Sequence, residues 1–284
     1  MGAAFIVALR EGIEAALIVS ILLAYLRQLG RRDRVHLVWW GTALAIGVSV
    51  VAGTVIFVLG TEFEGTAEQL FEGLVTLTAV SVLTWMIFWM RRQGARIKSE
   101  LQERVDTALT TGGLALAVLA FTAVLREGVE TALFLYAAAK GTAVDAGGVS
   151  GQVAGALLGL GLAVVLGVLL YRGGIHMDLR TFFRLTGSIL IVVAAGLFAF
   201  SIHELQEAGW FPFLTATAFD LSSALPDDRG IGTVLRGLVG YNADPSVLEL
   251  LSWLGYLAIV GTLYIRPQPS IALHPAPAVE RSDG

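Results

Sequence analysis

The chain has 284 residues, of which 56% are hydrophobic and only 15% are charged, and its mean hydropathy is +0.75. Soluble globular proteins carry roughly 25% charged residues, so this composition excludes an ordinary water-soluble domain and also an intrinsically disordered chain. The sequence has no cysteine, which excludes disulfide scaffolds, thiolate metal sites and cysteine nucleophiles. The net charge of −4 becomes informative only when the charges are placed along the chain.

Seven hydrophobic segments are long enough to cross about 30 Å of hydrocarbon as helices of roughly 20 residues. They run from Ala3 to Leu26, Leu37 to Leu59, Leu70 to Met90, Leu109 to Ala139, Val153 to Tyr171, Phe182 to Ile202 and Val247 to Ile265. The first segment has no basic start and carries three charges, so we expect it to be retained and not cleaved as a signal peptide. The predicted fold is all-α, a polytopic membrane protein with a single transmembrane domain over residues 1–266.

Basic residues are concentrated in alternate predicted loops. The segments after spans one, three, five and seven contain four, five, three and two Lys or Arg residues, 14 in all, whereas the other side has only Lys140, Arg229 and Arg236. By the positive-inside rule, we expect a multi-pass protein of the cell (inner) membrane with its amino terminus outside and its carboxyl terminus in the cytoplasm. Residues 267–284 contain four of the seven prolines and are predicted to be a disordered cytoplasmic tail.

A short segment of the first span reappears in the fourth. Residues 8–14 have the sequence A-L-R-E-G-I-E, and residues 124–130, 116 positions later, have V-L-R-E-G-V-E. Three spans separate each element from its copy, so the copies cross the membrane in opposite directions, as in transporters with inverted-topology repeats. We predict repeat one at about 1–106, repeat two at about 107–210, an outer loop at 204–246, and a seventh helix at 247–265 outside this 3+3 repeat.

Each copy of the motif places three charges in the middle of a predicted span and on one helix face. The six residues are Arg10, Glu11, Glu14, Arg126, Glu127 and Glu130. A charge at the centre of a membrane helix costs roughly 2.5 to 3.5 kcal/mol, so the six need compensating interactions. The structural alternative pairs each arginine with the glutamate four residues later. It leaves Glu11 and Glu127 without partners and a net charge of −2.

Four carboxylates that converge from two helices offer only hard oxygen ligands, because neither span contains a thiol or an imidazole. Such ligands suit hard cations such as Fe(III), Mn(II), Mg(II) or Ca(II). Gly12 and Gly128, between the two acids of each motif, leave room for close helix packing. Four carboxylates this close together cannot all stay ionised without a metal, so we expect metal binding to release protons and uptake to weaken in acid.

The two R-E-G-x-E motifs resemble the signature of the iron permease family, which includes fungal oxidase-dependent iron transporters and bacterial EfeU. The resemblance covers nearly the whole chain, including F-E-G at residues 71–73 and H-E-L-Q-E-A-G-W at residues 203–210. It implies high-affinity uptake with the iron ion as transported substrate and no permanently bound cofactor. It also implies an extracytoplasmic partner that oxidises or delivers the iron.

The resemblance assigns roles to the motif residues. The implied metal ligands are Glu11, Glu14, Glu127 and Glu130, with Arg10 and Arg126 orienting them. A second group, at the predicted outer surface, consists of Glu64, Glu68, Glu72, His203, Glu204 and Glu207. The first three of these would form one acidic helix face if helical, or simply a solvated helix start with acids near the N-terminal dipole. For the last three, a capping or interfacial role is the alternative.

We expect the acidic outer face to attract iron, the central glutamates to bind it, and rocking of the repeats to expose it inward. Fe(III), after or coupled to external oxidation, is the expected ion; Fe(II) stays open because oxygen ligands accept both. The alternatives are a transporter of another hard divalent cation such as Mn(II), a membrane-embedded carboxylate metalloenzyme, and a structural subunit. The sequence contains no Walker motif, G-x-x-x-x-G-K-[ST], so we do not expect this chain to hydrolyse ATP. We expect the protein to contact the lipid bilayer and not to bind nucleic acid. The sequence does not indicate its oligomeric state.

Overall fold

The computed structural model describes residues 2–93, 97–141, 148–172, 179–227 and 229–266. The helices are α1 (Gly2–Gln28), α2 (Val35–Glu62), α3 (Thr66–Gln93), α4 (Ile97–Thr111), α5 (Gly113–Gly141), α6 (Gly148–Tyr171), α7 (Leu179–Glu207), α8 (Gly230–Val239) and α9 (Val247–Ile265), with a 3-10 turn at Arg32–Arg34. The described part of the chain has no β-strand, which confirms the all-α prediction. The predicted tail at 267–284 lies outside the described residues.

Each of the seven predicted spans overlaps one long helix. Five segments are long and apolar enough to cross a membrane: Arg32–Gly60, Thr66–Arg91, Ser150–Tyr171, Thr181–Glu207 and Val247–Ile265. The helices α1 and α5 are as long, but each carries the three charges of one motif in its middle. A multi-pass helical protein is therefore supported, and the count of seven spans stays a prediction.

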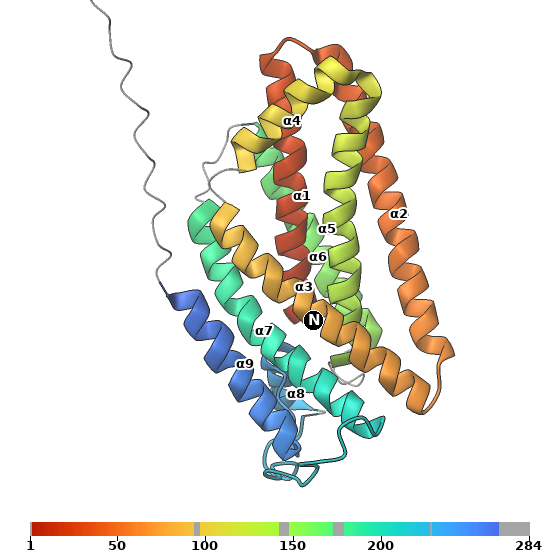
Figure 1. Ribbon diagram of the computed structural model, residues 1–284, viewed down its shortest axis with the longest axis vertical. Helices are drawn as coiled ribbons and strands as arrows, with labels where there is room; N and C mark the ends of the chain where they lie inside the picture. The colour runs from red at the N-terminus through yellow and green to blue at the C-terminus, as the bar shows by residue number, and fades with distance from the viewer. Residues whose placement is uncertain (1, 94–96, 142–147, 173–178, 228, 267–284) are drawn as a thin grey trace, which may run out of the picture.

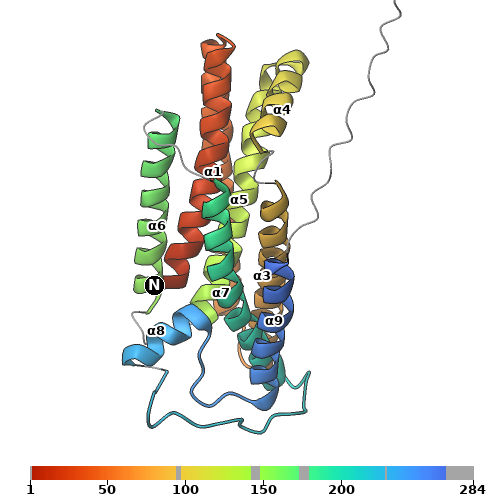
Figure 2. The same ribbon diagram turned by 90° about the vertical axis from the view of Figure 1, so that its left-hand side faces the viewer.

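The long helices form a row and a second layer. The helix α1 packs along α6, α5 packs along α2, and α1 contacts α5, so the row runs α6, α1, α5, α2. On one side of α1 and α5 lie α3, α7 and α9, with α7 between its two neighbours (Figures 1 and 2). If the labels of α1 and α5, of α2 and α6, and of α3 and α7 are exchanged, every helix keeps an equivalent neighbour. The row is then read in the reverse order, and α3 still packs against α7. This is the arrangement that the predicted inverted repeat requires, and the repeat stays a prediction.

The segment between the third and fourth predicted spans contains a helix that the sequence analysis missed. In α4, the buried residues Leu101, Val105 and Ala108 pack against α1 and α5 in an apolar cluster. The predicted start of the fourth span at Leu109 is wrong, because Leu109 belongs to α4. The chain turns at Gly112, whose φ of 138° favours glycine, before α5 begins.

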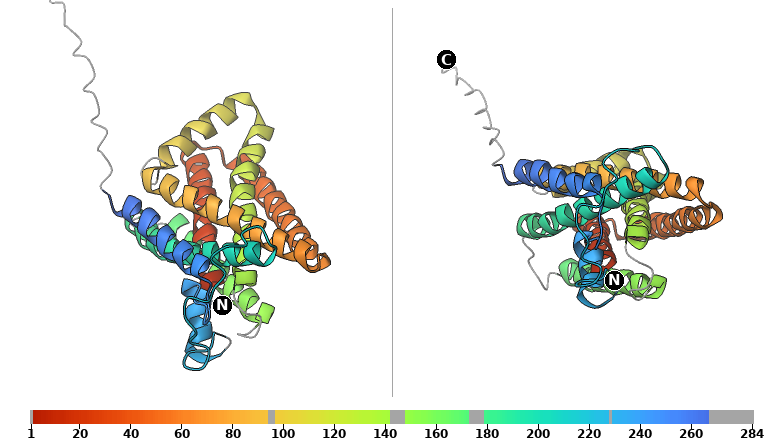
Figure 3. Two further views of the ribbon diagram at one scale, coloured as in Figure 1. Left: turned by 60° about the horizontal axis from the view of Figure 1, so that its bottom comes forward. Right: turned by 90° about the horizontal axis from the view of Figure 1, so that it is seen from below.

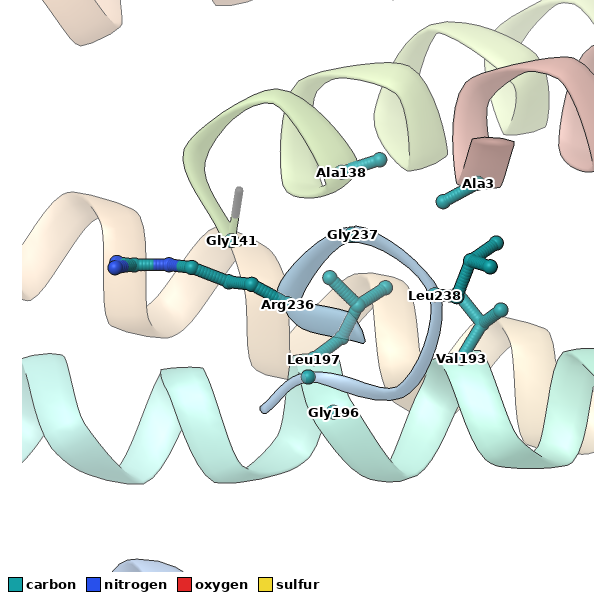
Figure 4. Close-up of a pocket in the computed structure, with 10 residues that line it drawn as sticks. Ala3, Ala138, Gly141, Val193, Gly196, Leu197, Arg236, Gly237 and Leu238 are labelled. Carbon is teal, nitrogen blue, oxygen red and sulfur yellow. The ribbon is translucent and has the colours of Figure 1, made fainter. Parts of the chain in front are cut away.

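The predicted outer loop at 204–246 also contains helical structure. It includes the last residues of α7 and the whole of α8, which lies beside the start of α1 (Figure 3). The α8 helix ends at Gly240, with φ 70°, where the backbone lies directly against Gly196 of α7. Between these elements is a small pocket lined in part by Ala3 and Gly141 (Figure 4). The loop therefore packs over the ends of α1 and α5.

Two apolar clusters fill the interior, and the motif charges lie between them. One cluster joins Val7 of α1 and Phe134 of α5 to α3, α7 and α9. The other joins Leu22 of α1 and Leu116 of α5 to α4. Because α1 and α5 run in opposite directions, each motif is flanked by both clusters. The charged layer is thus bounded on both sides by apolar side chains.

Candidate metal site

The two motifs meet where α1 and α5 contact each other. Glu11 and Glu14 of α1 and Glu127 and Glu130 of α5 are all buried. One carboxylate oxygen from each of Glu11, Glu14 and Glu127 lies within 4.8 Å of the other two. Two segments 116 residues apart in sequence therefore bring three carboxylates to within the reach of one ion.

The fourth glutamate, Glu130, is adjacent to this group of three and not part of it. Its Oε1 accepts a hydrogen bond from Arg126 Nε at 3.1 Å. Its charge acts electrostatically on both Glu11 and Glu14. Glu130 is thus held by the arginine of its own motif, close to the other three carboxylates.

Each arginine lies close to both glutamates of its own motif. The nitrogen–oxygen distances are 3.5 Å for Arg10–Glu11, 3.2 Å for Arg10–Glu14, 3.5 Å for Arg126–Glu127 and 3.1 Å for Arg126–Glu130. If each arginine paired only with the glutamate four residues later, Glu11 and Glu127 would have no partner. That expectation is wrong, because each of them lies 3.5 Å from the arginine of its own motif. Two cations still face four anions, so the ionised cluster has a net charge of −2 and can accept a further cation.

Several carboxylate oxygens of the cluster are buried and make no hydrogen bond to any described residue. They are both oxygens of Glu11, Oε1 of Glu14, and Oε2 of Glu127 and of Glu130. Oε1 of Glu11 and Oε1 of Glu14 still lie close to Arg10. A buried carboxylate oxygen that lacks a hydrogen bond is costly, and a bound cation or proton would satisfy it. All the available donors are carboxylate oxygens, which suit hard cations, iron and manganese among them.

The two copies of the motif differ in their surroundings. The side chain of Arg10 is 1% exposed, whereas that of Arg126 is 36% exposed. Arg126 is covered on one face by Trp89 of α3, with its Cζ 4.6 Å from the ring centre, within the range of a cation–π interaction. The equivalent residues Ile13 and Val129 differ in the same sense, being buried and exposed respectively. The first copy is enclosed and the second borders the surface of the bundle.

The two motif glycines allow neighbouring helices to approach closely. A Cβ at Gly12 would lie 2.7 Å from the Cβ of Ala163 in α6, and a Cβ at Gly128 would lie 2.6 Å from the Cβ of Ser49 in α2. The close packing expected at these glycines therefore occurs. It joins α1 to α6 and α5 to α2, and both contacts lie on the opposite side from the carboxylates.

The outer acidic residues of the third span lie beside a lysine. Glu68 and Glu72 are in the first turns of α3, but Glu64 precedes the helix, so the three do not form one helical face. The Nζ of Lys140, at the end of α5, contacts Oε1 of Glu72 and lies 3.6 Å from Oε1 of Glu68. Lys140 was counted in the sequence only as a loop charge, because nothing in the sequence places the end of α5 against α3.

The outer residues at the end of α7 join three helices. His203 Nε2 lies 3.4 Å from Glu207 Oε1, and His203 Nδ1 lies 3.4 Å from Oε2 of Glu249, a buried residue of α9. Gln69 of α3 donates a hydrogen bond of 2.8 Å to Glu207. Glu204 interacts electrostatically with Glu72. The structure thus brings the two outer groups together, and it adds Glu249, whose only sequence signal was an acid in the first turn of a predicted span.

The chain is similar in sequence to a family of known proteins. Residues 1–268 match the Iron permease FTR1 family. A protein named "Ferrous iron permease EfeU" from Escherichia coli O6:K15:H31 is 41% identical over 266 residues, which cover 93% of this chain and 95% of the relative. Proteins of the same name from Shigella sonnei (42% over 256 residues, 89% of this chain and 91% of the relative) and Yersinia pestis (38% over 271 residues, 94% of each) are also similar.

No solved structure matches the chain. The match to the family spans the nine helices of the described residues, and the family is one of permeases, so the prediction of a transporter and not an enzyme is confirmed. The chain belongs to the Iron permease FTR1 family.

Proposed function

We propose that this chain imports iron across the cell (inner) membrane through the carboxylates of its two motifs. Glu11, Glu14 and Glu127 are the first ligands, since their oxygens are already grouped within 4.8 Å. Glu130 becomes the fourth when it turns from Arg126 toward the ion. The observation that carries the proposal is the convergence of buried carboxylate oxygens from both copies, several of which lack hydrogen bonds to described residues. Because these ligands bind metal only when deprotonated, uptake should weaken in acid.

The ion taken up is iron, in a form set by its partner outside the membrane. Membership of the iron permease family and the names of the relatives support iron as the substrate. The name "ferrous" favours Fe(II) as the form that is delivered, whereas hard carboxylate ligands favour Fe(III) after oxidation. An extracytoplasmic oxidase or delivery protein, as the sequence suggested, would reconcile the two by oxidising iron before or during its transfer.

Iron enters at the end of the bundle where the acidic residues gather. Glu68, Glu72, Glu204 and Glu207 lie at this end, on α3 and α7, and the basic segment Arg31–Arg34 lies before α2 at the opposite end (Figure 1). The positive-inside rule makes the acidic end the outer one, with the amino terminus outside. Negative charge at the outer end raises the local concentration of cations there.

Movement of the two repeats against each other would open the site alternately to the two sides. Equivalent packing contacts support a repeat: a Cβ at Gly167 would lie 2.6 Å from Ala16 Cβ, and a Cβ at Gly53 would lie 3.1 Å from Ala132 Cβ. Ala132 follows Ala16 by the same 116 positions that separate the motifs. The apolar clusters on both sides of the charges correspond to a closed state between the two openings.

Uptake of radioactive iron into cells or vesicles tests the proposal. Glu14→Ala and Glu130→Ala should each reduce uptake to background, whereas Glu103→Ala, an exposed residue of α4, should leave it unchanged at matched membrane abundance. Supplying Fe(II) under reducing conditions and Fe(III) as a soluble chelate identifies the form transported. Competition by Mn(II) that abolishes iron uptake at equal concentration would instead favour the alternative of a general hard-cation transporter.

A further inference from the structure

The short helix α8 is apolar but too short to cross a membrane. Its 10 residues include one charged side chain, that of Arg236, which pairs with Asp227. The apolar residues Ile231, Val234 and Leu238 are three and four positions apart, so they form one stripe along the helix. An apolar helix of about 10–14 residues is typical of a buried, interfacial or re-entrant segment. The depth of α8 relative to the long helices decides between these.

Two contacts place the end of α8 beside the membrane-spanning parts of α7 and α9. A Cβ at Gly240, where α8 ends, would collide with the backbone of Gly196 in α7. The indole Nε1 of Trp253 in α9 donates a hydrogen bond of 2.8 Å to the carbonyl of Val239. Gly196 lies six residues inside the predicted outer end of its span, and Trp253 lies six residues inside the start of α9, which is about 9 Å along each helix. The end of α8 is therefore well below the outer ends of both spans.

The start of α1 is also set back from the outer end of the bundle. In Figures 1 and 2, α1 begins further into the bundle than the outer ends of α3 and α9. Leu238 covers this start, since a Cβ at Gly2 would lie 2.6 Å from its Cδ2, and Leu238 lines a pocket with Ala3 (Figure 4). The first backbone N–H groups of a helix have no partner within it, so in a membrane they need protein around them. The packed half of α8 supplies that cover.

The other half of α8 is not covered by any part of the chain that the structure describes. Ile231 is 71% exposed and Val234 is 57% exposed, although both belong to the stripe that Leu238 packs against α1. Val234 is six residues, or about 9 Å, before Gly240, so even a helix parallel to the spans would bring it no further out than their ends. Figure 2 shows α8 lying obliquely across the long helices, which keeps Val234 deeper.

We infer that α8 is a re-entrant helix in the outer half of the bilayer, with Ile231 and Val234 against the acyl chains of the lipid and Leu238 against the start of α1. The inference rests on the proposed function only for which side is the outer one. The end of α8 satisfies its backbone groups as a membrane requires: the Gly240 N–H donates to the carbonyl of Arg236, and the next carbonyl along accepts from the indole of α9. A segment that the sequence places in an outer loop thus acquires the bilayer as its partner.

Collision rates of a nitroxide spin label test the inference in the purified, full-length protein reconstituted in phospholipid nanodiscs. Because the sequence has no cysteine, Val234→Cys, Ile259→Cys and Ser223→Cys each give one labelled site. Ile259 of α9 is 63% exposed and is the lipid-facing control, and Ser223, an exposed residue of the loop before α8, is the water-facing control. Molecular oxygen concentrates in lipid and a neutral nickel chelate in water, so the ratio of the two collision rates reports the surroundings of the label.

Val234→Cys should give an oxygen-to-nickel ratio close to that of Ile259→Cys and several-fold above that of Ser223→Cys. A ratio as low as that of Ser223→Cys would overturn the inference, and so would low collision rates with both probes, because protein would then cover this face. If Val234→Cys does not fold, Ile231→Cys decides by the same comparison with Ser223→Cys. The measurement involves no iron, so the proposed transport function fails separately, by persistent uptake in the Glu14→Ala protein.

Discussion

The two copies of the R-E-G-x-E motif share nearly the same sequence but differ in environment. Arg10 is enclosed in the bundle and interacts electrostatically with Tyr264 of α9, whereas Arg126 is one-third exposed and covered on one face by Trp89. The local geometry is alike, since each arginine contacts both glutamates of its motif. The difference teaches that the sequence of the motif determines the ion pairs, and that the helices packed around it determine how much of each pair is shielded.

The largest effect on iron uptake is expected when a metal ligand is removed from either copy of the motif. Glu11→Gln and Glu127→Gln should each lower iron uptake at least about 100-fold, because both copies supply oxygens to the same ion and removal even of supporting groups costs 10- to 100-fold. Radioactive iron uptake at matched membrane abundance measures this effect. Near-normal uptake by either variant would show that one copy suffices, in conflict with a shared site.

Removing the arginines should reveal the difference in burial. Arg10→Ala leaves two buried carboxylates without their cation and also empties a fully enclosed volume, so we expect a loss of about 3–5 kcal/mol in stability. Arg126→Ala should cost less than half of that, because its side chain borders the surface. Thermal melting of the two purified variants in detergent compares them. Equal destabilisation would contradict the asymmetry of the two copies.

The glycines test whether the packing behind the two copies is equivalent. Gly12→Ala and Gly128→Ala should each destabilise the protein by about 1–3 kcal/mol through overpacking against Ala163 and Ser49. Ala163→Gly should rescue only the first variant, and Ser49→Gly only the second. Melting temperatures of the single and double variants give the result. Failure of both rescues would mean that these contacts do not limit the packing of the helices.

The smallest expected effect concerns Trp89. Trp89→Leu should cost about 0.5–1 kcal/mol by removing the cation–π interaction with Arg126, with little effect on uptake. The cost should vanish in an Arg126→Leu background, which a double-mutant cycle of melting measurements can show. Additive effects of the two substitutions would argue against a direct interaction.

Features that the sequence repeats, such as the motif, could be predicted from it. Features that depend on which helices pack against each other could not. The repeated motif and the hydrophobic segments around it correctly placed Glu11 and Glu127 in the middle of two long helices, α1 and α5. The α4 helix was missed because its composition is polar and its three buried residues become apparent only against α1 and α5.

Contacts between distant segments were not predictable in the same way. The ion pair of Lys140 with Glu72 and the contact of His203 with Glu249 each join two residues that are more than 40 positions apart in sequence. The sequence showed these residues as separate charges near predicted span ends, and only the packing of α5 on α3 and of α7 on α9 brings them together. The unequal exposure of Arg10 and Arg126 has the same origin, since the repeated sequence predicts equal environments.

X-ray absorption at the iron edge of the iron-loaded, purified protein tests the central claim most directly. The account predicts an oxygen-only coordination shell with carboxylate character, in a stoichiometry that falls when Glu11→Gln and Glu127→Gln are combined. Glu103→Ala, at an exposed residue of α4, serves as a control that should leave the spectrum unchanged. A nitrogen shell from histidine, or a spectrum and stoichiometry unaffected by loss of both glutamates, would contradict a shared carboxylate site in the two motifs.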